Sequence, residues 1–308
     1  MKFIKGVAVN QPVFAVLDNR GLLHVSGEQA HSFLQNLVTC DVDQVAATGA
    51  GFGALLTPQG KIQFDFLVVK TAEGYLLDTP APLVADLKKR LTFYKLRAKV
   101  ALDDVTGSTQ VVAVWRGKAD GADGVHVIED PRFEALGQRL YGPAETIEAL
   151  LAQGGAKDAG IEGYERHRIG YGVPQSVADF GMGEIFPHDA DMDDLNGVSF
   201  TKGCYVGQEV VSRVHHRGTA RKRFVSVTSK TPLPDPGTAI ETGGKAIGAL
   251  GSSTRTGDGF KGLALLRLDK AGAALEKGAS ITCGQESVAI ELPGWARFGW
   301  PAQETAAD

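Results

Sequence analysis

Paired cysteines are missing from this chain of 308 residues. Its three cysteines, Cys40, Cys204 and Cys283, are widely spaced and form no C-x-x-C pair. The sequence therefore encodes neither a zinc ribbon nor a complete cysteine-held iron–sulfur cluster, and we predict no metal site. An odd number of widely spaced cysteines fits a reducing compartment best.

Long apolar runs are also absent from the chain. No stretch reaches the roughly 18 apolar residues that a membrane-spanning helix needs. The N-terminal segment 1–21 has no apolar run followed by a small-residue cleavage site, so it does not resemble a signal peptide. We therefore expect a cytoplasmic protein without a membrane partner.

An excess of positive charge is missing as well. The 32 basic and 36 acidic side chains give a formal net charge of −4, which argues against nucleic acid as a partner. One local basic cluster could still meet RNA phosphates or the glutamate tail of a folate, or could be an ordinary charged surface. Its members are Arg213, Arg217, Arg221, Lys222 and Arg223.

Glycine, in contrast, is abundant. The chain has 39 glycines in 308 residues, whereas the usual share is about 7%. This excess predicts many tight turns and therefore many strands. The length suggests about two domains. We predict an α+β fold with a first domain over 1–221 and a small β-barrel domain over 222–308, because the pattern after residue 223 is nearly all strand.

Local patterns place several elements within the first domain. Segments 53–57 and 61–70 read as a hairpin, whose second strand should turn Ile62, Phe64 and Phe66 to one face and Asp65 to the other. Capping-box residues 26–29 should start a helix over 30–38.

Further along, Thr79 should cap a second helix. Residues 172–200 show no regular pattern, and their apolar side chains indicate an ordered, functional loop. Within it, the acidic run 189–193 opens like a calcium loop but has Asp194 where a glycine is needed, so we interpret it as a solvated acidic loop.

Residues suited to chemistry gather around Cys204. Close glycines on both sides let the backbone turn sharply, and Gln208 begins a predicted helix, so Cys204 precedes a helix N-terminus. The partial positive charge there favours a thiolate, as does neighbouring Lys202. A reactive or cluster-contacting thiol is one interpretation, and a small buried cysteine is the other. Gln208 and Glu209 could anchor a ligand, or Glu209 could simply be a favourable first-turn acid.

The string KGCYVGQE at 202–209 resembles the signature of the YgfZ family, which reads KGC-aromatic-x-GQE. The resemblance extends over most of residues 14–223. It includes TPQGKIQFDFLV at 57–68, RIGYGVP at 168–174 and FPHD at 186–189, in the order that the family has.

This resemblance implies a fold, a ligand and a role. The YgfZ family shares its fold with the aminomethyltransferase of the glycine cleavage system, in which two α/β halves and a C-terminal barrel surround a central hole that holds tetrahydrofolate. The family supports maturation or repair of iron–sulfur enzymes and affects tRNA modification. The resemblance therefore implies tetrahydrofolate or another reduced folate as the cofactor, and iron–sulfur assembly proteins or client enzymes as partners.

The resemblance also implies candidate site residues. Asp65 matches the transferase aspartate that faces the reactive folate nitrogen, so Asp65 and Cys204 are the catalytic candidates. The folate-binding candidates are Asp65, Lys202, Tyr205, Gln208, Glu209 and Arg213.

Two departures from the aminomethyltransferase bear on activity. The hairpin keeps only the second of two adjacent acids, at Asp65, and Gly170 stands where a pterin-holding glutamate is found in the transferase. These departures favour a folate-binding assembly factor. A folate-dependent aminomethyl or one-carbon transferase and an RNA-binding or tRNA-modifying protein remain the two alternatives.

Overall fold

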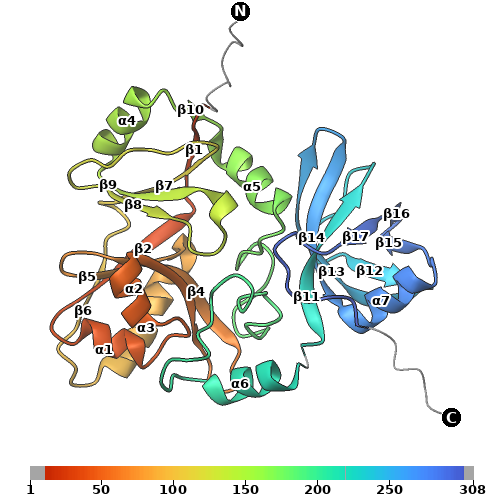
Figure 1. The fold of residues 1–308 in the computed structure, drawn as a ribbon, viewed down its shortest axis with the longest axis horizontal. Coiled ribbons are helices and arrows are strands. Elements are labelled where there is room, and N and C mark those ends of the chain that lie inside the picture. The colour runs from red at the N-terminus through yellow and green to blue at the C-terminus, as the bar shows by residue number, and fades with distance from the viewer. Residues whose placement is uncertain (1–10, 219, 302–308) are drawn as a thin grey trace, which may run out of the picture.

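The computed structural model describes residues 11–218 and 220–301, and their strands form three sheets (Figure 1). The signal-peptide prediction rests partly on residues 1–10, which lie outside the described residues. In the described part of the chain, no helix is both long and apolar enough to cross a membrane.

The first sheet is antiparallel, with the strand order β3-β4-β5-β2-β6. Its strands are β2 (Arg20–Ser26), β3 (Ala50–Leu56), β4 (Ile62–Lys70), β5 (Gly74–Pro80) and β6 (Ala101–Asp104). Three helices cover one face, α1 (Ala30–Gln35), α2 (Val42–Thr48) and α3 (Val84–Lys95). Their apolar stripes meet the alternate side chains of β4, such as Phe64 and Phe66, in one core cluster.

The second sheet has the order β10-β1-β7-β9-β8 and is antiparallel except for the β1–β10 pair. Its strands are β1 (Val13–Val16), β7 (Gln110–Trp115), β8 (His126–Glu129), β9 (Gln138–Gly142) and β10 (Lys157–Asp158). One face packs on α4 (Ala144–Gln153). The other face packs on α5 (Gly160–Gly170) and on residues of the first sheet.

Residues 171–207, all of them described, contain no helix or strand longer than an isolated bridge. The segment is nonetheless packed, because Val173, Met192 and Leu195 are buried in a core cluster that also holds Leu67 of β4. This confirms the prediction of an ordered irregular loop. Helix α6 (Gln208–Arg217) follows and begins at the predicted residue.

The third sheet is antiparallel and has the order β16-β15-β12-β13-β14-β11-β17. Its strands are β11 (Lys222–Ser229), β12 (Ala239–Thr242), β13 (Lys245–Thr256), β14 (Gly259–Arg267), β15 (Ile281–Cys283), β16 (Glu286–Ser287) and β17 (Ala289–Glu291). Helix α7 (Leu268–Glu276) packs Leu268, Ala271 and Ala274 into its core. The nearly all-strand reading of this region missed that helix.

The hairpin of β3 and β4 is confirmed, but one of its faces was assigned wrongly. The register shifts between Leu55 and Leu56, which pair with Phe64 and Ile62 and leave Gln63 in a bulge. Ile62 therefore packs in a different cluster from Phe64. Asp65 does lie opposite to the Phe64 face, as expected.

Both predicted helix caps were wrong. The Gln29 side chain makes no cap bond, and its amide oxygen accepts instead from the backbone N–H of Lys99 at 2.7 Å. Thr79 belongs to β5, and its hydroxyl donates to the Asp65 carbonyl at 3.0 Å. A 3-10 turn over Ala81–Leu83 separates that strand from α3. In each case a contact between distant segments replaced the local cap.

Candidate functional site

Cys204 is solvent-exposed, whereas Cys40 and Cys283 are buried. It lies in the last stretch of loop before α6, which begins at Gln208. The next residue, Tyr205, is buried and packs in the central core cluster. The loop is therefore fixed to the core on one side of the thiol while the thiol itself remains accessible, which excludes the interpretation of a small buried cysteine.

Gly207 anchors this loop against the β3–β4 hairpin. Its φ of 78° lies in the left-handed region, and a Cβ there would come within 2.5 Å of the Thr57 carbonyl oxygen. Gly60, at the hairpin turn, is equally confined, because its Cβ would lie 2.9 Å from the Val210 Cβ of α6. The two glycines let the hairpin turn and the start of α6 approach each other closely.

Lys202 is directed toward the segment around Cys40. Its ammonium donates to the carbonyl oxygens of Val38 at 2.9 Å and Cys40 at 2.7 Å, and it lies 5.5 Å from the Tyr205 ring centroid. Burial lowers the pKa of Lys202, and burial raises the pKa of the Cys40 thiol to about 12. Lys202 thus holds the loop in place through backbone carbonyls.

Glu209 and Arg213 pair with each other on the exposed side of α6. Their side chains meet at 2.7 Å, one helical turn apart, and are 83% and 57% exposed. Gln208 is partly buried, and its backbone N–H bonds the Tyr205 carbonyl at 3.3 Å. The structure thus brings Lys202 and Tyr205 beside the Cys204 loop, whereas the Glu209–Arg213 pair faces solvent.

Asp65 lies in the interior. It is 7% exposed, and its Oδ1 atom is buried without a hydrogen-bond partner. Burial raises the pKa of Asp65, although Ser176, Arg20 and Arg132 act in the opposite direction. The Ser176 hydroxyl is also buried without a partner of normal geometry. Asp65 is therefore not a solvent-facing acid.

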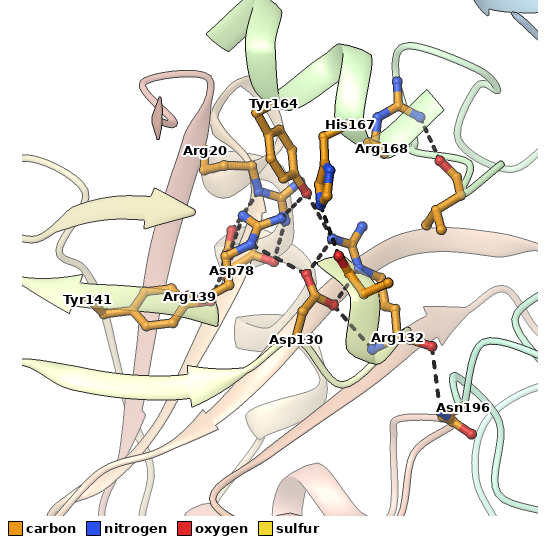
Figure 2. A network of polar contacts seen from close by, with 12 residues as sticks. Arg20, Asp78, Asp130, Arg132, Arg139, Tyr141, Tyr164, His167, Arg168 and Asn196 are labelled. Carbon is orange, nitrogen blue, oxygen red and sulfur yellow. Dashed lines mark hydrogen bonds and ion pairs between the residues drawn. The ribbon is translucent and has the colours of Figure 1, made fainter. Parts of the chain in front are cut away.

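A buried network of charged residues lies between β5, β9 and α5 (Figure 2). Two of its members, Arg20 and Arg132, lie near enough to Asp65 to act on its pKa. Asp78 accepts from Arg20 Nε at 2.6 Å and from the Tyr141 hydroxyl at 2.9 Å. Its other neighbour is Arg139, with Nη1 at 3.8 Å from Asp78 Oδ2. The charged side chains here are at most 9% exposed.

The network continues to Asp130, which Arg132 holds with two bonds of 2.9 and 2.7 Å. The Tyr164 hydroxyl accepts from both Arg132 and Arg139 (Figure 2). Burial would raise the pKa of Asp130, but the two guanidinium groups hold it below its usual value. Sequence reasoning missed this network; one usable signal was Asp78, a charge that directly follows the apolar residues 75–77.

Arg223, one member of the basic cluster, meets the acidic loop in the interior, which corrects two expectations. Asp191 is fully buried, and Asp193 accepts two bonds from Arg223, at 2.5 and 2.8 Å. The acidic run is therefore not a solvated loop, and Arg223 is not part of a basic surface. His188 is 3% exposed, and neither ring nitrogen has a hydrogen-bond partner, although Nε2 lies 3.9 Å from Asp193 Oδ2. Burial lowers the pKa of His188 to about 4.

No group of three or more His, Cys, Asp or Glu side chains among the described residues is arranged to hold a metal ion. The described residues thus offer no such group of ligands around Cys204.

The fold and the β-barrel each have a known counterpart. The crystal structure of glycine cleavage system aminomethyltransferase T from Bartonella henselae superposes with a TM-score of 0.75 at 14% identity, covering 94% of this chain and 88% of that one. Residues 221–298 match the family described as CAF17, C-terminal beta-barrel domain. The chain thus has the aminomethyltransferase-like α/β fold with a C-terminal β-barrel, and the fold prediction is confirmed.

Sequence relatives show which family with this fold the chain belongs to. The human mitochondrial iron–sulfur cluster assembly factor IBA57 is 32% identical over 312 residues, covering 92% of this chain and 84% of that protein. Its mouse counterpart is 31% identical, covering 82% and 76%. This chain belongs to the IBA57 family of iron–sulfur cluster assembly factors, which is related to the YgfZ family that the KGCYVGQE motif resembles.

The expectation of a cytoplasmic location is wrong in the light of these relatives, which are named mitochondrial proteins. That expectation rested on the lack of a signal peptide and of a membrane span. Neither property distinguishes the cytoplasm from other reducing compartments.

Proposed function

We propose that this chain assists the assembly or repair of iron–sulfur enzymes through the thiol of Cys204. The observation that carries the proposal is that Cys204 is exposed on a loop held by close backbone packing, while the other two cysteines are buried. The names of the human and mouse relatives support this role.

A cluster at Cys204 would have to be shared with another protein. Cysteine-held clusters use about four ligands, and the described residues offer no group of three metal-binding side chains. We therefore propose an iron–sulfur assembly protein or client enzyme as the partner, with Cys204 supplying one ligand to the cluster as it is passed on.

We also propose that tetrahydrofolate, or another reduced folate, binds at Asp65. Two neighbouring buried oxygen atoms, Asp65 Oδ1 and Ser176 Oγ, have no hydrogen-bond partner of normal geometry, which supports a polar ligand here. Such atoms are costly to leave unpaired, and the amide and amine edges of a pterin could satisfy them. Because burial raises its pKa, Asp65 could donate a proton or a hydrogen bond to a pterin nitrogen. The folate, when bound, would supply the one-carbon chemistry.

The two alternative functions have less support. For the transferase, Gly170 is exposed at the end of α5 and has no side chain to hold a pterin, and its carbonyl accepts from Lys261 at 2.9 Å. For RNA binding, Arg223 is buried and Arg213 is paired with Glu209, so the basic cluster loses two of its five free charges. Any effect on tRNA modification would then act through an iron–sulfur enzyme.

Two measurements test the two halves separately. Calorimetric titration with tetrahydrofolate should show saturable binding that Asp65→Asn weakens and Asp103→Asn, at an exposed position of β6, leaves unchanged. Absence of binding by the unaltered protein would overturn the folate proposal. Cys204→Ser should abolish support of iron–sulfur enzyme activity in cells lacking the protein while the thermal melt is unchanged. Full activity of that variant would overturn the role of the thiol.

A further inference from the structure

The C-terminal half of α3 and the residues after it, 88–99, expose apolar side chains that the fold does not use; we call this segment the α3 patch. Phe93 is 70% exposed and Leu96 is 89% exposed, more than any other large apolar side chain among the described residues. The opposite side of the helix is buried through Leu87 and Leu91. Phe93 and Leu96 therefore lie on a face that does not pack into the core. A polar residue at either position would avoid exposing apolar surface to water.

The backbone at Leu96 is also unusual. Its φ of 45° and ψ of −105° end the helix in a conformation that favours glycine. A β-carbon at positive φ costs energy, and such strain is retained mainly where a function requires it. Here the strained residue is a leucine whose side chain stands in solvent.

The charged residues of the same segment as Phe93 and Leu96 are all basic. The α3 patch reads KKRLTFYKLRAK, with six basic residues and no acid, in a chain of net charge −4. Lys99 pairs with Glu28 at 2.8 Å, and the Arg90 guanidinium lies over the Phe93 and Tyr94 rings at 5.7 and 5.1 Å. The remaining cations leave a positive field around an apolar centre.

A cavity of about 690 Å³ opens beside the α3 patch. Its lining includes Phe93 and Arg90 from α3, Phe64 from β4, Met182 from the long loop, and Thr57 from the hairpin turn. The Thr57 carbonyl is the atom against which Gly207 packs. The cavity therefore shares a wall with the structure that supports the Cys204 loop.

We propose that the α3 patch and this cavity dock an acidic protein that inserts an apolar side chain into the cavity and thereby meets Cys204. This inference rests on the proposed function, because the docked protein would be the one that shares the cluster. Complementary charge would draw the partner in and fix its orientation, and the apolar anchor would hold it. A protein is favoured over RNA or a membrane because the cavity can receive a side chain and because the acidic residue Asp86 is part of its lining.

The test begins with a photo-cross-linking amino acid in place of Thr92, an exposed residue that lines the cavity, in the full-length protein inside producing cells. The cross-linked partner is identified, purified and titrated against four variants. Leu96→Asp and Lys89→Glu alter the α3 patch. Leu275→Asp and Lys277→Glu are matched controls at exposed positions on and just after α7 in the barrel domain.

We expect one protein with acidic residues at the cross-linked site. Binding should be at least about tenfold weaker for Leu96→Asp, because a charge would replace an apolar side chain that the docked protein covers. Lys89→Glu should weaken binding most at low salt, and both barrel variants should bind normally. A cross-link only to RNA or lipid, no cross-link at all, or normal binding by Leu96→Asp would overturn the proposal.

Failure of this inference can be told apart from failure of the proposed function. Leu96→Asp should keep its affinity for tetrahydrofolate while losing iron–sulfur enzyme support, since the variant leaves Asp65 and Cys204 in place. If Leu96→Asp keeps that support but Cys204→Ser loses it, docking at the α3 patch is wrong and the thiol's role stands. If Cys204→Ser is fully active, the proposed function fails whatever the patch binds.

Discussion

The buried network around Asp130 and the loop around Cys204 are held in place in different ways. In the network, side chains hold one another: Asp130 is fully enclosed and bound by Arg132 and Arg139. At the Cys204 loop, backbone packing at Gly207 and the bonds of Lys202 to backbone carbonyls hold the chain, and the thiol is exposed. The side chains of a buried network bind one another and leave none free for a ligand. A loop that is held by its backbone can keep a thiol in a fixed position and still leave it free to bind a partner.

The largest effect that we expect is a loss of stability when the buried network is disrupted. Asp130→Ala leaves Arg132 and Arg139 buried without their carboxylate, and we expect a loss of about 3–5 kcal/mol in the free energy of unfolding. Urea denaturation measures it. Asp269→Ala, which removes the exposed partner of Arg267, should cost less than about 1 kcal/mol. Equal losses would mean that the network does not stabilise the interior as a buried charge cluster.

The next effect depends on pH and concerns His188. Because burial lowers its folded-state pKa to about 4, below the ordinary 6.5, its contribution to stability is present above pH 6.5. That contribution is lost as pH falls toward 4, by up to about 3 kcal/mol. His188→Asn should remove this part of the slope when unfolding free energies are compared at pH 7 and pH 4.5. An unchanged slope in the variant would show that His188 is already solvated.

A smaller loss of stability is expected when the backbone packing of the Cys204 loop is disrupted. Gly207→Ala requires a β-carbon at positive φ against the Thr57 carbonyl, and we expect it to cost about 1–3 kcal/mol and to shift the Cys204 loop. Gly203→Ala is the matched control, because a Cβ there meets nothing within 4 Å. Thermal denaturation of the two variants should separate them; equally mild effects would mean that the clamp is loose.

The last prediction concerns reactivity rather than stability. Iodoacetamide at pH 8 should modify Cys204 first, because it is exposed, while Cys40 and Cys283 stay protected by burial. Burial raises the pKa of both of those thiols, to about 12 for Cys40, and a protonated thiol reacts poorly. Peptide mass spectrometry reports the order of labelling. Early modification of Cys40 would indicate that the loop near Lys202 opens readily.

Local periodicity was enough to predict the hairpin of β3 and β4, helix α6 and the irregular loop before it. It failed where the deciding contact was distant in sequence. Thr79 reads as a helix cap but bonds Asp65. The bulge that turns Ile62 away from Phe64 also has no local signal, because it depends on the register with β3.

The candidate site divides in the same way. The Cys204 loop could be predicted because its residues are contiguous in the sequence and its glycines indicate tight turns. The charge network was not, because Asp78, Asp130 and Arg139 come from three separate segments that meet only in the fold. For a similar reason the sequence could not show that Arg223 points inward to Asp193.

The contact between Gly60 and Gly207 joins the two proposed ligands thermodynamically. Asp65 lies on β4, whose turn touches the start of α6, and no side chain stands between the two backbones to absorb a displacement. A folate that prefers one position of β4 would therefore bias the position of the Cys204 thiol. Linkage is reciprocal. If folate changes the affinity of Cys204 for its partner by some factor, the bound partner changes the affinity for folate by the same factor, through this one contact.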